Sequence, residues 1–206
     1  CDDNKTDGSS GITYYPILTM SGDEIVVLNI GDTYTEAGAS AKTGEDEVEV
    51  IVDVTVNTAE AGIYAIEYSA FNEDGFSAVA LRQVIVQDLA SIAGTDLSGT
   101  YKRTYYGGPK NGGYSEWVAG DVTGVYKVND VGGVDGEGYE YDLSVYQVAA
   151  DKFVMPVQPN EIGGTIFASS TAGGSSPDVI DMTATGYIWS VKGSGYGANP
   201  RTFEKQ

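Results

Sequence analysis

Histidine is absent from the sequence, and cysteine occurs once, as Cys1. Without histidine there can be no Ser-His-Asp triad, no Cys-His dyad and no His-ligated metal site. A single cysteine excludes a disulfide within the chain. No run of about 20 apolar residues is present, so no segment has the length of a transmembrane helix. These absences remove common hydrolase and metalloenzyme classes, and the sequence predicts no metal site and no cofactor.

Basic residues are also scarce: 11 Lys and Arg stand against 30 Asp and Glu, a net charge of −19. Phosphate binding needs clustered basic residues, so this balance argues against a nucleic-acid partner. It argues equally against electrostatic docking on an anionic membrane surface. The hydrophobic content of 41%, with 11% aromatics, suffices for a packed core. The composition therefore predicts a folded acidic protein rather than a disordered acidic tail.

The two halves of the chain differ in composition. Residues 1–90 hold 17 acidic and 3 basic residues, whereas residues 91–206 hold 13 and 8. Glycine shifts the other way, with 8 residues in the first part and 20 in the second. Such shifts mark domain boundaries, which here fall near residues 88–96. The expected organisation is a flexible tether over 1–11, a first domain over 12–90 and a second over 96–206.

Residues 12–88 show the pattern of β-strands separated by turns. Glu24–Ile30 is a β-branched run, and the valines from Val48 to Val56 alternate with mostly polar residues as though they shared one buried face. Glu60–Ile66 has the spacing of a tyrosine corner, in which the Tyr64 hydroxyl would bond back to the backbone. This half is predicted to form a β-sandwich.

A multi-part pattern in this half resembles the immunoglobulin-like repeats of bacterial surface proteins. It consists of Pro16–Thr19, Gly22-Asp23, Gly31-Asp32-x-Tyr34-x-Glu36-x-Gly38-Ala39, Gly62-x-Tyr64-x-Ile66-x-Tyr68, Asn72-x-Asp74-Gly75-Phe76 and Arg82-x-Val84-x-Val86. The resemblance implies an immunoglobulin-like β-sandwich whose last hairpin closes at the Asp-Gly near position 74. Such domains act mostly as spacers and adhesion modules, and no catalytic residues follow from the resemblance.

The second half also has strand patterns, with longer glycine-rich turns between them. It resembles the C-terminal domains of Bacteroides-type outer-membrane lipoproteins that accompany glycan-uptake systems. Its opening, Leu97-Ser-Gly-Thr-Tyr101, is similar to the first strand of lipocalin-like barrels. The expected fold class is therefore all-β: an immunoglobulin-like sandwich followed by an antiparallel β-meander, either barrel-like or an open sandwich.

Cys1 opens a polar stretch that resembles the start of mature bacterial lipoproteins, whose first cysteine is lipidated after the signal peptide is removed. Asp2 and Asp3 resemble the acidic export signal of surface lipoproteins in Bacteroides-type bacteria. The resemblance implies an outer-membrane protein exposed at the cell surface. The lipid on Cys1 would be its only contact with the membrane.

Aromatic residues beside glycine-rich loops are the candidate binding residues. Tyr114 and Trp117 follow the loop 107–113, and Tyr196 lies within the glycine-rich segment 193–197. Exposed rings there could stack on sugar faces, while neighbouring polar side chains bond the hydroxyls. The alternative is that these rings fill the β core, the interpretation that the pattern favours for Trp189.

We therefore expect a non-catalytic lipoprotein that binds glycan through its C-terminal domain as an accessory to polysaccharide uptake. The first alternative is a structural or adhesive module, without a sugar site, that meets another outer-membrane protein. A third is a hydrolase that uses two carboxylates, for which the second half supplies candidates. These are Asp121, Asp130, Asp135, Glu137, Glu140, Asp142 and Glu161.

Overall fold

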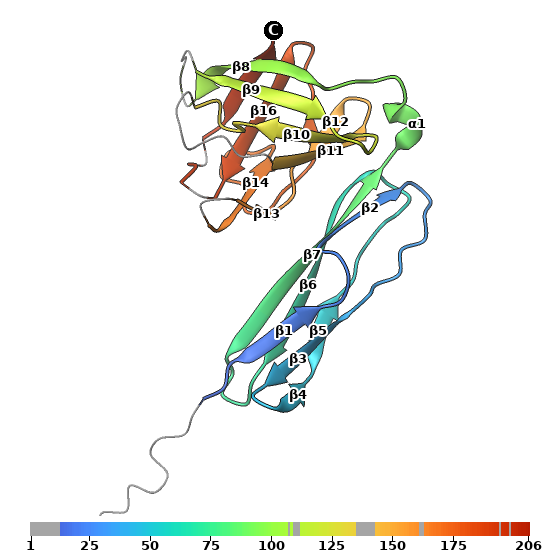
Figure 1. The fold of residues 1–206 in the computed structure, drawn as a ribbon, viewed down its shortest axis with the longest axis vertical. Helices are drawn as coiled ribbons and strands as arrows, with labels where there is room; N and C mark the ends of the chain where they lie inside the picture. Colours follow the sequence, from blue (N-terminus) through green and yellow to red (C-terminus); the bar gives the residue numbers. More distant parts are fainter. Residues whose placement is uncertain are drawn as a thin grey trace, which may run out of the picture. The chain divides into compact units, whose positions relative to one another are not determined.

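The computed structural model describes residues 13–106, 108, 112–134, 143–160, 163–193, 195–197 and 199–206. Cys1 and the predicted tether over 1–11 lie outside these residues. The first part of the described chain forms β1 (Pro16–Met20), β2 (Ile25–Asn29), β3 (Ala39–Thr43), β4 (Asp46–Val48), β5 (Val50–Asp53), β6 (Gly62–Phe71) and β7 (Ser77–Gln87). The short helix α1 (Leu89–Ile92) follows (Figure 1).

The remaining strands are β8 (Gly99–Tyr106), β9 (Tyr114–Ala119), β10 (Val125–Asn129), β11 (Leu143–Ala149), β12 (Lys152–Val154), β13 (Gln158–Pro159), β14 (Thr165–Ser169), β15 (Ile180–Asp181), β16 (Gly186–Lys192) and β17 (Arg201–Lys205). The prediction of an all-β chain is thus confirmed. No helix among the described residues is long and apolar enough to cross a membrane.

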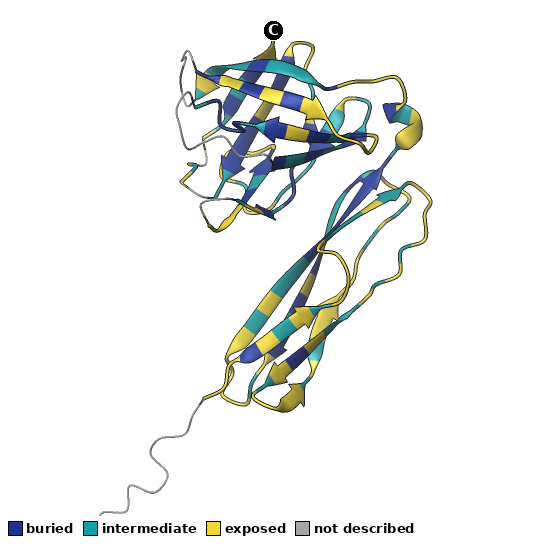
Figure 2. Cartoon of the chain, viewed as in Figure 1, coloured by how far each residue is buried: buried dark blue, intermediate teal, exposed yellow. Residues whose placement is uncertain are grey.

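Strands β1 to β7 form the two sheets of the immunoglobulin-like part. One has the order β1-β3-β4 and the other β2-β7-β6-β5, with β2 parallel to β7. On β6 the buried residues Ile66, Tyr68 and Ala70 alternate with more exposed ones, the period of a strand with one face in a core (Figure 2). The β6–β7 hairpin closes at Asn72–Gly75, as the resemblance implied, and Gly75 supplies the positive φ of 84° that the turn needs.

The chain divides into two compact units. The first is made of residues up to Glu24, Thr35–Thr55 and Ala65–Arg82. The second is made of Ile25–Tyr34, Val56–Tyr64 and Gln83–Gln206. Strands β6 and β7 therefore contribute residues to both units, so these units follow different limits from the expected domains. Whether residues 12–90 fold by themselves stays a prediction.

Arg82 is the largest buried residue of the first unit apart from the aromatic ones, and it is 1% exposed. Its guanidinium pairs with the Glu36 carboxylate and donates to the Tyr68 hydroxyl oxygen at 2.7 Å. The same guanidinium donates to the backbone carbonyls of Asp23, at 2.9 Å, and Ser21. This network ties three segments of the unit to one buried charge.

The second unit contains a ten-stranded sheet in the order β13-β14-β16-β17-β8-β9-β10-β11-β12-β15, with antiparallel pairing throughout. The sheet curls into a half-barrel (Figure 1), which confirms the expected antiparallel, barrel-like domain. The Gln158 side chain on β13 acts as a substitute strand partner for β11. Its amide accepts from the Ser144 backbone N–H at 2.8 Å and donates to the Ser144 carbonyl at 2.9 Å.

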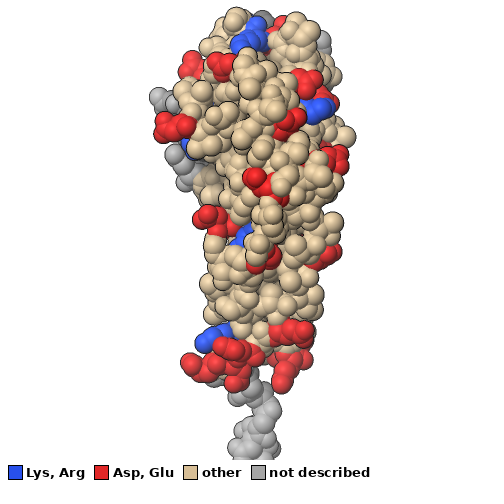
Figure 3. Space-filling view, turned by 90° about the vertical axis from the view of Figure 1, so that its right-hand side faces the viewer, with Lys and Arg blue, Asp and Glu red and all other residues tan. Residues whose placement is uncertain are grey.

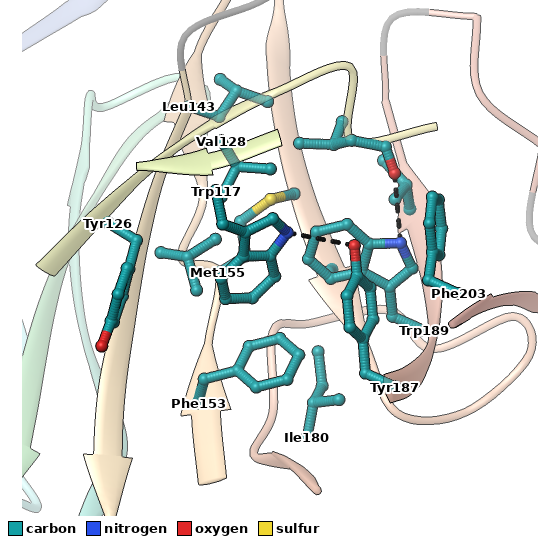
Figure 4. Close-up of a cluster of buried hydrophobic side chains, with 14 of the residues drawn as sticks. Trp117, Tyr126, Val128, Leu143, Phe153, Met155, Ile180, Tyr187, Trp189 and Phe203 are labelled. Atoms are coloured by element: carbon teal, nitrogen blue, oxygen red, sulfur yellow. Dashed lines mark hydrogen bonds between the residues drawn. The ribbon is translucent and has the colours of Figure 1, made fainter. Parts of the chain in front are cut away.

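Aromatic side chains fill the interior of the half-barrel (Figure 4). Trp117, Tyr187 and Trp189 form its centre, and each is at most 2% exposed. The two indole N–H groups are both satisfied: Trp117 donates to the Tyr187 hydroxyl and Trp189 to the Val131 carbonyl, each at 3.1 Å. Because buried polar groups are costly unless bonded, these two bonds allow the rings to fill the core.

The tyrosine corner expected at Tyr64 is present. The Tyr64 hydroxyl donates to the Glu60 carbonyl at 2.9 Å. Burial, the larger cause, and the nearby charge of Glu60 both raise the pKa of Tyr64. A second corner of the same spacing lies at the start of the half-barrel, where the Tyr101 hydroxyl donates to the Leu97 carbonyl at 2.7 Å. Burial, the largest cause, raises the pKa of Tyr101 to about 12.

Replacing Tyr64 with phenylalanine removes only the hydroxyl of the first corner. We expect Tyr64→Phe to lower the free energy of unfolding by about 1 kcal/mol, the usual net value of one hydrogen bond. Urea denaturation followed by circular dichroism measures this change. Tyr105, which is 38% exposed, provides the control, since Tyr105→Phe should change stability little. Equal stability of wild type and Tyr64→Phe would mean that the corner bond stabilises nothing.

Candidate functional site

The three aromatic residues singled out in the sequence do not form one surface. Tyr114 begins β9, is 48% exposed and has its ring 5.6 Å from the Lys102 amine. Trp117 lies on the opposite face of the same strand and is 2% exposed. Tyr196 is half-buried against the core of the half-barrel, with the Arg201 guanidinium over its ring at 5.1 Å.

The prediction that the Trp117 ring is available for stacking is wrong. Its neighbours are the rings of Phe153 and Tyr187, at centroid distances of 5.0 and 5.1 Å (Figure 4). A ring enclosed in this way has no free face for a sugar. The expectation that Trp189 belongs to the core is confirmed, since it is fully buried. Of the three candidate residues, only Tyr114 is largely exposed.

A hollow in the first unit combines exposed aromatic rings with polar side chains, the combination that the sequence predicts for the second half. Two exposed rings line it, Tyr14 at 55% and Phe71 at 48% exposure, and its volume is about 310 Å³. Its other lining residues are mostly polar: Thr13, Thr43, Asp46, Val48, Asn72, Glu73 and Asp74. We call it the Tyr14–Phe71 hollow. Its volume is near the lower end of the range of small-molecule sites.

Two hairpins and the start of the described chain shape this hollow. The Asn72 side chain at the end of β6 donates to the Tyr14 carbonyl at 2.9 Å and accepts from the Phe76 backbone N–H at 2.8 Å. Gly44, between β3 and β4, lies against the Tyr14 ring: a Cβ there would stand 3.4 Å from it. These contacts hold the Tyr14 ring without covering it.

The polar lining can exchange hydrogen bonds with a hydroxylated ligand. Asp46, Glu73 and Asp74 are exposed, and carboxylates accept from hydroxyl groups. The Thr43 hydroxyl oxygen is buried and bonds to nothing within the described residues. Next to the hollow, the exposed rings of Tyr15 and Phe76 pack at 4.8 Å and extend the apolar surface.

Sequence reasoning missed this hollow because its residues come from three separate segments. The one local signal is the pair Tyr14-Tyr15 directly before Pro16, which places two large rings ahead of the first strand. The sequence of the turn Asn72–Gly75 predicts only a hairpin, and nothing in it indicates that the turn approaches Tyr14.

The arrangement needed for a carboxylate-based hydrolase is not seen in the described residues. Asp121 is exposed, whereas Asp130 is 9% exposed, and burial raises the pKa of Asp130 to about 6. Asp135, Glu137, Glu140, Asp142 and Glu161 lie outside the described residues. No group of three or more His, Cys, Asp or Glu suited to a metal occurs in the part of the chain that the structure describes.

Comparison with known proteins gives a family match within the first half. Residues 18–86 match the family model described as "Bacterial surface protein, Ig-like domain", which confirms the expected resemblance over this range. No curated protein matches the chain. Among solved structures, a lipoprotein from Bacteroides thetaiotaomicron is 22% identical, with 93% of this chain and all of that one covered and a TM-score of 0.35.

Proposed function

We propose that this chain, with its bacterial surface Ig-like domain, is a non-enzymatic cell-surface protein that binds glycan. The observation that carries the proposal is the Tyr14–Phe71 hollow, where two exposed rings stand beside hydrogen-bonding side chains. Apolar sugar faces stack on aromatic rings, and carboxylates and amides bond the surrounding hydroxyls. This moves the expected sugar site from the C-terminal domain to the first unit.

Charge also favours a neutral ligand for the hollow. Its lining includes three acidic side chains and no basic one, and the chain as a whole carries −19. Acidic side chains also outnumber basic ones on the face shown in Figure 3. Like charges repel, so a neutral glycan fits this site better than an anionic one.

The mode of attachment is the second part of the proposal. A lipid on Cys1 would anchor the chain in the outer membrane, and the polar residues after it would act as a tether. The resemblance of this start to surface lipoproteins supports the anchor. A binding protein held in this way would present polysaccharide to an uptake system in the same membrane.

A glycan array on soluble protein beginning at residue 11 tests the function, and isothermal titration with the best glycan tests the site. Phe71→Ala and Tyr14→Ala should each weaken binding about 30-fold, the effect of removing a hot-spot ring. The control is Tyr114→Ala, which removes the exposed tyrosine of the half-barrel. Loss of binding in Tyr114→Ala alone would return the site to the C-terminal domain, and failure of every glycan would reject the function.

One observation favours the adhesive alternative. β5 is an edge strand, and it exposes Ile51 at 55% and Val52 at 43%, on opposite faces. An apolar edge of this kind can pair with an extended segment of another protein. This alternative becomes the first choice if no glycan binds.

A further inference from the structure

The half-barrel holds two arginines at one end of its interior. The chain has only three, and Arg103 on β8 and Arg201 on β17 are two of them. Both guanidiniums lie over the ring of Tyr106, with distances from Cζ to the ring centroid of 5.5 and 4.7 Å. The fold therefore brings two positive charges to one aromatic ring inside an acidic protein.

Neither guanidinium forms an ion pair among the described residues, where no carboxylate oxygen lies within 4.0 Å of either one. Arg103 donates to the Gly132 carbonyl at 3.0 Å, and Arg201 donates to the carbonyls of Gly197 and Asn199 at 3.4 and 3.2 Å. The Nε atoms of both arginines are buried without an acceptor. Arg82, the third arginine, is by contrast paired with Glu36.

This arrangement is costly for Arg201, which is only 2% exposed. Burial, the largest cause, lowers the pKa of Arg201, and the charge of Arg103 lowers it further, while the neighbouring tyrosines and Asp130 act in the opposite direction. A buried charge without an ion-pair partner is normally avoided in proteins. An anion beside the two guanidiniums would remove their mutual repulsion and give their N–H groups acceptors.

An unsatisfied acceptor lies at the same end. Oδ1 of Asp130 is buried and receives no hydrogen bond, although the same carboxyl accepts from the Val134 backbone N–H through Oδ2 at 2.7 Å. The Asp130 carboxyl interacts electrostatically with both arginines. Since most buried polar atoms in proteins are bonded, unsatisfied donors and acceptors at one place indicate a ligand that has both.

We propose that this end of the half-barrel binds a small hydroxylated carboxylate, with the carboxylate facing Arg103 and Arg201 and a hydroxyl donating to Asp130. Arginine is suited to this task because its planar fork matches a carboxylate. Sulfate would accept hydrogen bonds from the guanidiniums but has no proton to donate to Asp130. A neutral sugar would donate to Asp130 and leave the two guanidiniums without an ion pair.

This site is separate from the Tyr14–Phe71 hollow, and its ligand differs in charge. Around the buried Arg201, the side chains of Arg103, Tyr106 and Tyr196 are half-buried. Failure of one proposal therefore leaves the other standing.

The test is thermal unfolding and titration of the chain with D-glucuronate, D-glucose and sulfate at matched ionic strength. A ligand that binds the folded state raises Tm as its concentration rises. In the Tyr14→Ala variant, which lacks the ring of the Tyr14–Phe71 hollow, glucuronate should raise Tm, sulfate should do so less, and glucose should not. Equal shifts with sulfate would reduce the site to an adventitious anion only. No shift with glucuronate, or an equal one with glucose, would overturn the proposal.

Variants locate the binding. Arg103→Gln should weaken glucuronate binding at least about tenfold, and Arg103→Lys should restore part of it, because lysine keeps the charge but not the fork. The matched control is Lys102→Gln, which removes the same charge from the next residue of β8, beside Tyr114. Unchanged affinity in Arg103→Gln, with circular dichroism showing an intact fold, would also overturn the proposal.

Discussion

Replacing Trp117 with alanine is expected to lower the free energy of unfolding by about 3–5 kcal/mol. The ring is enclosed by Tyr101, Phe153, Tyr187 and Trp189, so its removal leaves a cavity in the centre of the half-barrel (Figure 4). It also leaves the Tyr187 hydroxyl without the indole donor. Thermal unfolding followed by near-ultraviolet circular dichroism reports this loss directly, because the affected rings dominate that signal.

Tyr114→Ala is the matched control for this variant. It removes another large ring from the same strand, but from the exposed face, and should change stability by less than about 0.5 kcal/mol. Trp117→Phe should fall between the two, since it keeps a ring and loses the hydrogen bond. Equal stabilities for Trp117→Ala and Tyr114→Ala would show that the Trp117 ring is not part of the core.

Arg82→Met should be almost as damaging, with a loss of about 3–5 kcal/mol from the first unit. The substitution leaves the largely buried Glu36 carboxylate without its positive partner, and an uncompensated buried charge is strongly destabilising. Two backbone carbonyls, those of Ser21 and Asp23, also lose their donor. Urea denaturation measures the effect on the free energy of unfolding.

Neutralising Glu36 as well should recover part of this loss of stability. Arg82→Met combined with Glu36→Gln removes the ion that the single variant strands, so the double variant should be more stable than Arg82→Met alone. A double variant that loses as much as the sum of the two single ones would mean that the charges do not act as a pair.

The strand pattern and the tyrosine corner could be predicted because both depend on residues close in sequence. Strand geometry also explains why Trp117 is buried. Tyr114 and Trp117 are three positions apart, and on a strand an odd separation places two side chains on opposite faces. Once residues 114–119 are read as a strand, the exposure of one ring therefore implies burial of the other, as observed.

The valines in and just after β5 show what a strand pattern alone cannot predict. Their alternation predicted one buried face, yet Val52 and Val54 are 43% and 44% exposed. Alternation specifies which side chains share a face, but whether that face is covered depends on the neighbours. β5 is an edge strand, so fewer neighbours cover it.

The arginine cluster could not be predicted for a further reason. Arg103 and Arg201 are nearly a hundred residues apart and meet only because β17 pairs with β8. The register shift at Thr202/Phe203 sets which residues of the two strands face each other. No local sequence pattern carries this information.

The ends of the ten-stranded sheet bear on how these molecules behave when crowded. Both terminal strands, β13 and β15, are only two residues long. β13 contains Pro159, which has no backbone N–H to offer. The side-chain amide of Gln158, the other residue of β13, is hydrogen-bonded to the backbone of Ser144. Sheet ends of this kind resist growth into aggregates. Many copies of the half-barrel could therefore be packed side by side at a cell surface and remain separate molecules.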